Sequence, residues 1–259
     1  MALAFDEYKD RFRYVAISRD QGVVEMVLHD KGDTLLWNDA IHEELVDALL
    51  YVGRDPETKV VILTGAGEDF CPGPNPESFH FDGSVPPVGL DHIYAEGKDL
   101  IHNLLNVRVP VIAAVHGRAH SHSELALLSD IVLCTPQASF RDPHFEYGIV
   151  PGDGVQIAFL MGFGMNRGRY YLLTGKEISA AEALAAGVVA EVVGRDGLLP
   201  RARELAAQLA RQPILTLRYT RETLVAELQR FAHDHLGHSL ALEGFSSGYG
   251  AWGGSLHND

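Results

Sequence analysis

One short segment of the sequence concentrates residues that could do chemistry: His116, His120, His122 and Glu124. Imidazoles and a carboxylate at such spacings could ligate zinc or iron. The segment follows an apolar run and lies in a turn, which does not place all three imidazoles on one face. We therefore predict no metal here, and we interpret His116 and His120 as polar turn residues.

Residues 244–248 (GFSSG) match the pattern of a serine nucleophile elbow. That motif needs a preceding strand, a following helix, and an acid and then a histidine later in the chain. Only His257 and Asp259 follow, in the opposite order. A serine hydrolase is therefore disfavoured.

Apolar periodicity predicts the elements that must position these residues. A hairpin is expected over 14–28, and an amphipathic helix carries apolar residues from Ile41 to Val52 on one face. Buried strands are expected at 59–64, 110–115 and 130–134, and helices at 93–105, 169–173, 180–186, 198–209 and 215–228. The segment 65–87 is rich in Gly, Pro and Asp and is predicted to be a functional loop. This order predicts an α/β protein with a helical C-terminal part.

Composition limits the function classes. The chain has 259 residues and a formal net charge of -14, which disfavours nucleic acids and anionic membranes as partners. No apolar run is long enough for a membrane span, and residues 1–12 do not resemble a signal peptide. Two cysteines make no disulfide framework. We expect a cytoplasmic protein.

Several longer motifs resemble the crotonase (enoyl-CoA hydratase/isomerase) superfamily. They are 110–117 (PVIAAVHG), 123–133 (SELALLSDIVL), 148–154 (GIVPGDG) and 183–189 (ALAAGVV). The resemblance implies a crotonase fold, with a spiral of ββα units over residues 1–195 and a helical trimerisation region over 196–259. It also implies a homo-oligomer, either a trimer or a dimer of trimers.

Departures from the family pattern bear on the activity. Typical members carry N-G-x-A-x-G-G-G-x-E-L-A after the strand, and a glycine amide there helps to bind a thioester enolate. Here histidines replace the glycines at 116–124, and Pro74, which has no N–H, stands where the second amide is expected. His144 replaces a catalytic glutamate, and Asp153 replaces a small residue. These substitutions resemble the 6-oxocamphor hydrolase type of β-diketone hydrolase.

This narrower resemblance implies roles for seven residues. His144 would be the general base that deprotonates water, with Asp153 hydrogen-bonded to its ring. The donors to ketone or enolate oxygens would be His122 and Trp37. His42 or Glu243 would organise water or reprotonate the enolate, and Phe79 would contact the substrate. Five of them have a structural alternative: a buried structural pair for His144 and Asp153, core packing for Trp37, and solvent exposure for His42 and Glu243. For Glu124, catalysis and helix capping stay equal alternatives.

The resulting prediction is hydrolysis of a carbon–carbon bond in a cyclic, small-molecule β-diketone, without metal or coenzyme A. The alternative enzyme is a CoA-thioester hydratase, isomerase or thioesterase of the same superfamily. The alternative outside enzymology is an inactive binding module. A degenerate protein should lose polar groups from its pocket, whereas this chain has gained His122, His144 and Asp153, which favours an enzyme.

Overall fold

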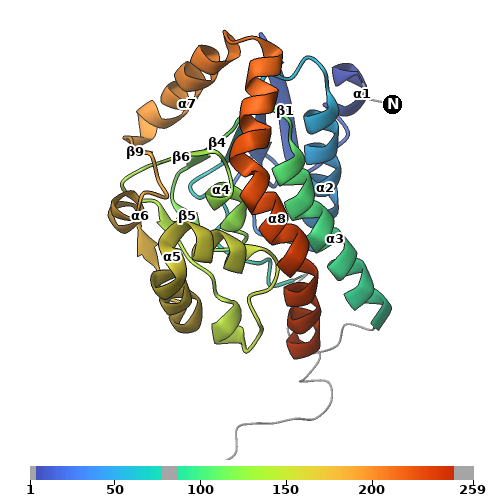
Figure 1. Ribbon diagram of the computed structural model, residues 1–259, viewed down its shortest axis with the longest axis vertical. Helices are drawn as coiled ribbons and strands as arrows, with labels where there is room; N and C mark the ends of the chain where they lie inside the picture. Colours follow the sequence, from blue (N-terminus) through green and yellow to red (C-terminus); the bar gives the residue numbers. More distant parts are fainter. Residues whose placement is uncertain (1–3, 78–86, 248–259) are drawn as a thin grey trace, which may run out of the picture.

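The computed structural model describes residues 4–77 and 87–247, and its centre is a six-stranded sheet in the order β1-β2-β3-β4-β6-β9. The pair β1 and β2 is antiparallel, and every later pair in this sheet is parallel. Figure 1 shows helices packed along this sheet. A smaller sheet has the order β5-β7-β8. The predicted α/β class is confirmed.

The strands are β1 (Val15–Asp20), β2 (Val23–Leu28), β3 (Val60–Gly65), β4 (Val111–Val115), β5 (Arg118–Ala119), β6 (Ile131–Cys134), β7 (Ser139–Phe140), β8 (Ile178–Ser179) and β9 (Glu191–Val192). The helices are α1 (Phe5–Tyr8), α2 (Asp39–Arg54), α3 (Pro87–Asn106), α4 (Glu124–Leu127), α5 (Val155–Thr174), α6 (Ala180–Ala186), α7 (Arg195–Ala210) and α8 (Ile214–Ser247), with a 3-10 helix η1 (His144–Tyr147).

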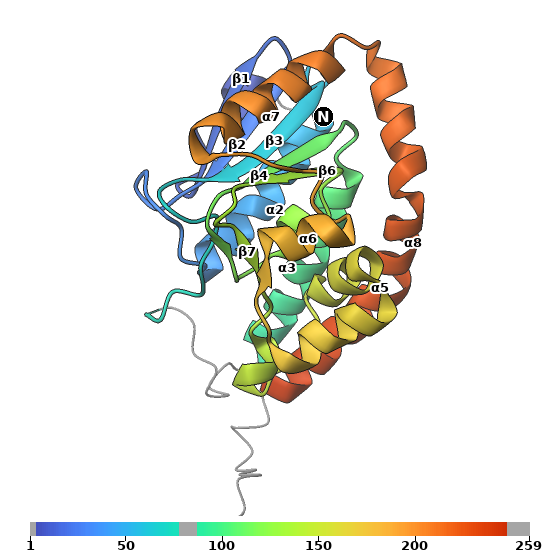
Figure 2. The ribbon, with the colours of Figure 1, turned by 90° about the vertical axis from the view of Figure 1, so that its left-hand side faces the viewer.

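The central strands are apolar on both faces because each face is covered. In β3, Val60 and Ile62 face a small core that includes Leu198 of α7, whereas Val61 and Leu63 face the main core with α2 and α3. Alternate side chains of a strand point to opposite faces, so the strand needs apolar residues throughout. Figure 2 shows α7 lying across the sheet, with α8 to one side.

Helix α8 is held in place by one buried arginine. Arg221 is 2% exposed and donates from Nε to Asp130 Oδ2 at 2.6 Å. Its other nitrogens donate to the carbonyl groups of Leu104, Leu105 and Val107, at the C-terminal end of α3. These carbonyl groups lack partners within the helix, so Arg221 satisfies them while its charge is balanced by Asp130.

The hairpin, the three buried strands and the capped helix after Ser179 are confirmed. The last helix is longer than the predicted 215–228, because α8 continues to Ser247. Ser246 therefore lies in a helix and not at a nucleophile elbow, and its hydroxyl donates to Glu243 O. The predicted boundary between the spiral core (1–195) and the helical C-terminal region (196–259) falls at the start of α7. This division of the chain stays a prediction.

Within the described ranges 4–77 and 87–247, none of the helices combines the length and the apolar character needed to cross a membrane.

We expect Arg221→Leu to lower the free energy of unfolding by about 3–5 kcal/mol, because it removes the cation that balances Asp130 and a donor to the Val107 carbonyl group. The control is Arg230→Leu, which removes an exposed ion pair with Glu227 and should cost less than about 1 kcal/mol. Urea unfolding at one fixed protein concentration measures both. Equal effects of the two substitutions would contradict this account of α8.

Candidate active site

A cavity of about 340 Å³ opens beside the ends of β3 and β4, where α2, α3 and α8 meet the loops after the strands. In α/β proteins, ligands bind at the carboxyl ends of parallel strands. Six of the seven residues with predicted roles line it: Trp37, His42, His122, His144, Asp153 and Glu243. The seventh, Phe79, lies outside the described residues.

Trp37 offers a hydrogen-bond donor to the cavity. Asn38 caps α2 by accepting from Ile41 N at 3.2 Å, which places Trp37 immediately before the helix. The Trp37 side chain is fully buried, and its Nε1 atom has no hydrogen-bond partner among the described residues. Buried polar groups are nearly always paired, so an acceptor from a ligand is the natural partner of this N–H.

His122 stacks on Trp37, with ring centroids 3.7 Å apart and planes inclined by 28°. Its backbone has φ 49°, in the left-handed region, which turns the short loop into α4. Burial lowers the pKa of His122 to about 3, so the ring is neutral. Neutral imidazole can donate from only one of its two nitrogens.

Glu124 determines which nitrogen of His122 donates. Its Oε1 atom lies 2.7 Å from His122 Nδ1. Burial, followed by the neighbouring charge of Asp153, raises the pKa of Glu124 well above its usual value. A protonated Glu124 donates to Nδ1 and leaves the proton of His122 on Nε2. Glu124 therefore contacts His122 directly, in addition to being the first residue of α4.

His144 is held by Asp142. Its Nδ1 atom lies 2.6 Å from Asp142 Oδ1, and Asp142 is 2% exposed. Asp153 was expected to make this hydrogen bond, and that expectation is wrong: Asp153 Oδ2 lies 3.8 Å from the other nitrogen, Nε2. The reason is local, because Pro143 precedes η1 and turns the chain so that Asp142 meets His144, the first residue of η1.

Asp153 lies between the two histidines. Its Oδ2 atom is 3.6 Å from His122 Nδ1 and 3.8 Å from His144 Nε2, and its Oδ1 atom accepts from Val155 N at the start of α5. Burial alone would lower the pKa of His144. The charge of Asp153 and the hydrogen bond and charge of Asp142 outweigh it and raise that pKa well above its usual value.

Glu243 reaches the cavity from α8. Gly152 allows this approach, because a Cβ atom there would lie 2.3 Å from Ser239 O. The Gly152 N–H donates to Glu243 Oε2 at 3.1 Å, and Glu243 Oε1 lies 3.8 Å from His144 Nε2. Burial, then Asp153, raises the pKa of Glu243 to about 8.

Two histidines of the segment 116–124, His116 and His120, do not belong to the site. His120 contacts Ser139 Oγ at 2.8 Å, and His116 is buried; neither lines the cavity. His42 does line it and lies 3.5 Å, Nδ1 to Oε2, from Glu96. Sequence reasoning missed Asp142 and Glu96; for Asp142, the spacing Asp-Pro-His was an available signal.

In the part of the chain that the structure describes, three groups of possible metal-ligating side chains have their ligand atoms within 4.8 Å of one another: His122, Glu124 and Asp153; His144, Asp153 and Glu243; and Glu43, His92 and Glu96. In the first group, His122 Nδ1 and Glu124 Oε1 are 2.7 Å apart. Two ligands of a tetrahedral zinc ion are about 3.4 Å apart, given bonds of about 2.1 Å. That pair is hydrogen-bonded and does not have the spacing of a zinc site.

Residues 18–242 match the enoyl-CoA hydratase/isomerase family, and the chain belongs to that family. It is 31% identical to 1,2-epoxyphenylacetyl-CoA isomerase of Escherichia coli K12 over 203 residues, 76% of each chain. It is 33% identical to carnitinyl-CoA dehydratase of Proteus mirabilis over 181 residues, 69% of this chain and 68% of the other. The predicted superfamily and crotonase fold are confirmed.

One solved structure is similar over nearly the whole chain. It is a β-diketone hydrolase of Anabaena sp. PCC 7120 bound to (S)-3-oxocyclohexyl acetic acid, with 40% identity, a TM-score of 0.90, and coverage of 93% of this chain and 97% of the other. An enoyl-CoA hydratase/isomerase of Mycobacterium paratuberculosis has 25% identity, a TM-score of 0.86 and coverage of 92% and 95%. The predicted closeness to β-diketone hydrolases is confirmed.

We expect Asp142→Asn to lower the pKa of His144, because it removes a buried negative charge and the acceptor on Nδ1. Titration of the His144 ring resonances by NMR measures this directly. Asp39→Asn, at an exposed position of the cavity wall, is the control. An unchanged His144 pKa in Asp142→Asn would contradict the assigned contact.

Proposed function

We propose that this enzyme hydrolyses a carbon–carbon bond of a cyclic, in particular bicyclic, β-diketone by a retro-Claisen reaction and releases a keto acid. One observation carries the proposal: Trp37 Nε1, a donor without a described protein partner, shares a cavity with His144 Nε2, which lies between two carboxylates. The 40% identity to a β-diketone hydrolase supports it.

Trp37 and His122 bind the ketone oxygens in this proposal. An indole N–H and a neutral imidazole N–H are donors suited to an oxygen that becomes negative in the transition state. They replace the two backbone amides of a thioester site. Pro74, which has no N–H, lines the cavity wall and pairs with Trp37 in an isolated β-bridge.

Water attacks with the help of His144. Neutral His144 accepts a proton from water at Nε2, and the hydroxide adds to one carbonyl carbon. The carbon–carbon bond then breaks, giving a carboxyl group and an enolate held by Trp37 and His122. Glu243, protonated below its pKa of about 8, donates its proton to the enolate carbon. His144 returns the water-derived proton to Glu243 across the 3.8 Å between Nε2 and Oε1.

The proton count is consistent with these roles. His144 and Glu243 lie close enough to titrate as a pair. With one shared proton, the pair has two forms. In the first form His144 is neutral and Glu243 is protonated; in the second form His144 is an imidazolium and Glu243 is a carboxylate. The substrate reacts with the first form. Asp142 is a positioning residue in this scheme, because it fixes the tautomer with the proton on Nδ1.

Many relatives are named for CoA thioesters, so the proposal must be tested against that chemistry. The test offers the enzyme the bicyclic diketone whose ring opening gives 3-oxocyclohexyl acetic acid, and separately crotonyl-CoA. We expect turnover of the diketone, unchanged by a chelator, and no hydration of crotonyl-CoA. Turnover of crotonyl-CoA alone would favour the hydratase, turnover of neither would favour an inactive binding module, and loss of activity with the chelator would favour a metal enzyme.

We expect His144→Ala to lower kcat by about 10²–10⁴ with little change in KM, because proton removal from water belongs to the transition state. His122→Ala should lower kcat and raise KM, because a carbonyl donor contacts both ground and transition states. His120→Ala, outside the cavity, is the matched control and should retain activity. A His144→Ala enzyme that keeps most of its kcat would assign His144 a structural role.

We propose a trimer, or a dimer of trimers, as the assembly. Large apolar side chains are exposed on α5 and α8, among them Met165, Leu173, Leu224 and Phe245. Burial of such surface between subunits drives association. Light scattering at micromolar concentration should give three or six times the mass of the 28.3 kDa chain. A monomeric mass would contradict the assembly.

A further inference from the structure

Carboxyl side chains greatly outnumber lysine and arginine side chains in the described lining of the cavity. Its described lining includes seven carboxyl side chains: Asp39, Glu43, Glu96, Glu124, Asp142, Asp153 and Glu243. Arg141 is the single lysine or arginine among the described lining residues, and it is ion-paired with Glu146 and donates to Gly175 O at 2.7 Å. Burial favours the neutral forms of Glu124 and Glu243, but the other five carboxyl groups still outnumber Arg141 and His144. A cleft with an excess of one sign of charge focuses its electric field, so an anion entering this cavity is repelled.

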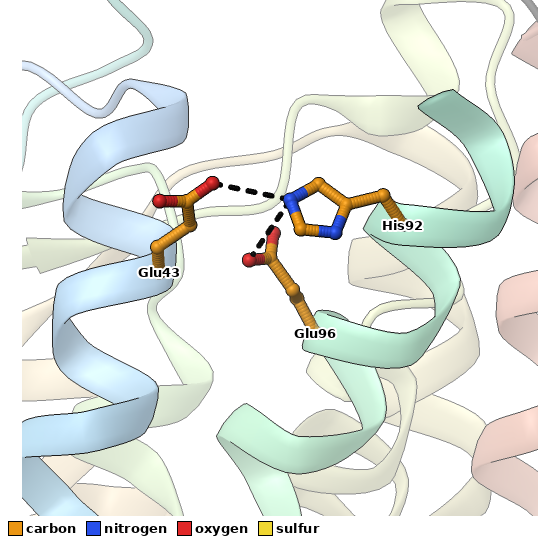
Figure 3. A group of neighbouring side chains, drawn as sticks. All are labelled: Glu43, His92 and Glu96. Atoms are coloured by element: carbon orange, nitrogen blue, oxygen red, sulfur yellow. Dashed lines mark hydrogen bonds and ion pairs between the residues drawn. The ribbon is translucent and has the colours of Figure 1, made fainter. Parts of the chain in front are cut away.

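Three residues of the cavity lining, Glu43 from α2 and His92 and Glu96 from α3, contact one another across the two helices. We name Glu43, His92 and Glu96 the rim triad (Figure 3). His92 Nε2 lies 3.1 Å from Glu43 Oε1 and 3.3 Å from Glu96 Oε1. The side chains of His92 and Glu43 are 61% and 59% exposed, whereas those of His122 and Asp153 are 9% and 7% exposed. His92 and Glu43 therefore lie nearer to solvent than the reacting groups, whereas Glu96, at 16%, is about as buried as His144 and Glu243, at 17% each.

The rim triad also contacts the substrate side of the cavity. Glu96 Oε2 lies 3.5 Å from His42 Nδ1, and the His42 ring meets the Trp37 ring edge-on, with centroids 5.8 Å apart. A ligand bound against Trp37 is therefore close to the charge of Glu96.

The net charge of the rim is negative in either state of His92. The hydrogen bond to Glu43 and the charge of Glu96 raise the pKa of His92, and Asp39 adds to the effect. A protonated His92 supplies one positive charge against the three carboxylates that face it. A neutral His92 supplies none.

We propose that the rim triad makes this cavity selective by charge, so that it admits uncharged ketones and disfavours carboxylates and acyl-CoA thioesters. This inference rests on the proposed function for the choice of ligands. A β-diketone is uncharged and is not repelled, whereas the keto acid formed from it carries a carboxylate and is. The same charges that admit the substrate therefore promote release of the product.

The size of the effect follows from the exposure of the triad. Charges near solvent are screened, and one interaction between two exposed charges changes a binding affinity by about twofold to fivefold. Removing two carboxylates should therefore change the affinity for a singly charged anion by about fourfold to 25-fold. The affinity for an uncharged ligand of the same shape should hardly change.

The test compares two ligands of one shape, 3-oxocyclohexyl acetic acid and its methyl ester. Calorimetry near neutral pH and low ionic strength measures both with the wild-type enzyme and with the Glu43→Gln/Glu96→Gln double variant. We expect the wild-type enzyme to bind the ester more tightly than the acid. The double variant should bind the acid about fourfold to 25-fold more tightly and the ester within twofold of wild type. Glu227→Gln, at an exposed position of α8, is the control and should change neither affinity.

Other outcomes overturn the inference. Equal affinities for acid and ester in the wild-type enzyme, an acid-to-ester ratio unchanged in the double variant, or failure of both ligands to bind would each do so. Zinc binding by the wild-type enzyme that is lost in the double variant would make the triad a cation site instead. Because the readout is binding, charge selection without diketone turnover would refute only the proposed function. Diketone turnover with an unchanged ratio would refute only the charge selection.

Discussion

Four carboxyl groups and two imidazoles, all largely buried, share one cavity and cannot all be charged at once: Glu124, Asp142, Asp153, Glu243, His122 and His144. Burial penalises every isolated charge, so protons stay on some of these groups. The pKa of Glu243 rises to about 8, that of His122 falls to about 3, and that of His144 rises. In the proposed mechanism, one proton shared between His144 and Glu243 supplies a base and an acid in the same site.

The fold brings these groups together from distant parts of the chain. The turn at Pro143 holds His144 against Asp142, the start of α5 presents Asp153, and α8 delivers Glu243 past Gly152. Arg221 holds the other half of α8 to the end of α3. In this family, the amide donors of a thioester site are the expected arrangement; here two side-chain rings, Trp37 and His122, stand at the cavity wall.

Periodicity was enough to predict the hairpin, the buried strands and most helices, because each is a regular element with one or two apolar faces. The candidate residues came from the family resemblance, and the structure brings six of them together in one cavity. Neither the apolar periodicity nor the family resemblance predicted which side chains of the site contact one another. The bond from Asp142 to His144 depends on the turn at Pro143, and the contact of His42 with Glu96 depends on how α2 packs on α3.

The dependence of kcat/KM on pH tests the central claim, that His144 acts as base and Glu243 as acid, most directly. His144 must be neutral, and its raised pKa makes activity fall as the pH drops toward its usual value of about 6.5. Glu243 must be protonated, so activity also falls above its pKa of about 8. We predict a bell-shaped profile with an alkaline maximum, slower turnover in Glu243→Gln, and no fall at high pH in that variant. A rate for the wild-type enzyme that stays constant down to pH values below about 6.5 would contradict the account.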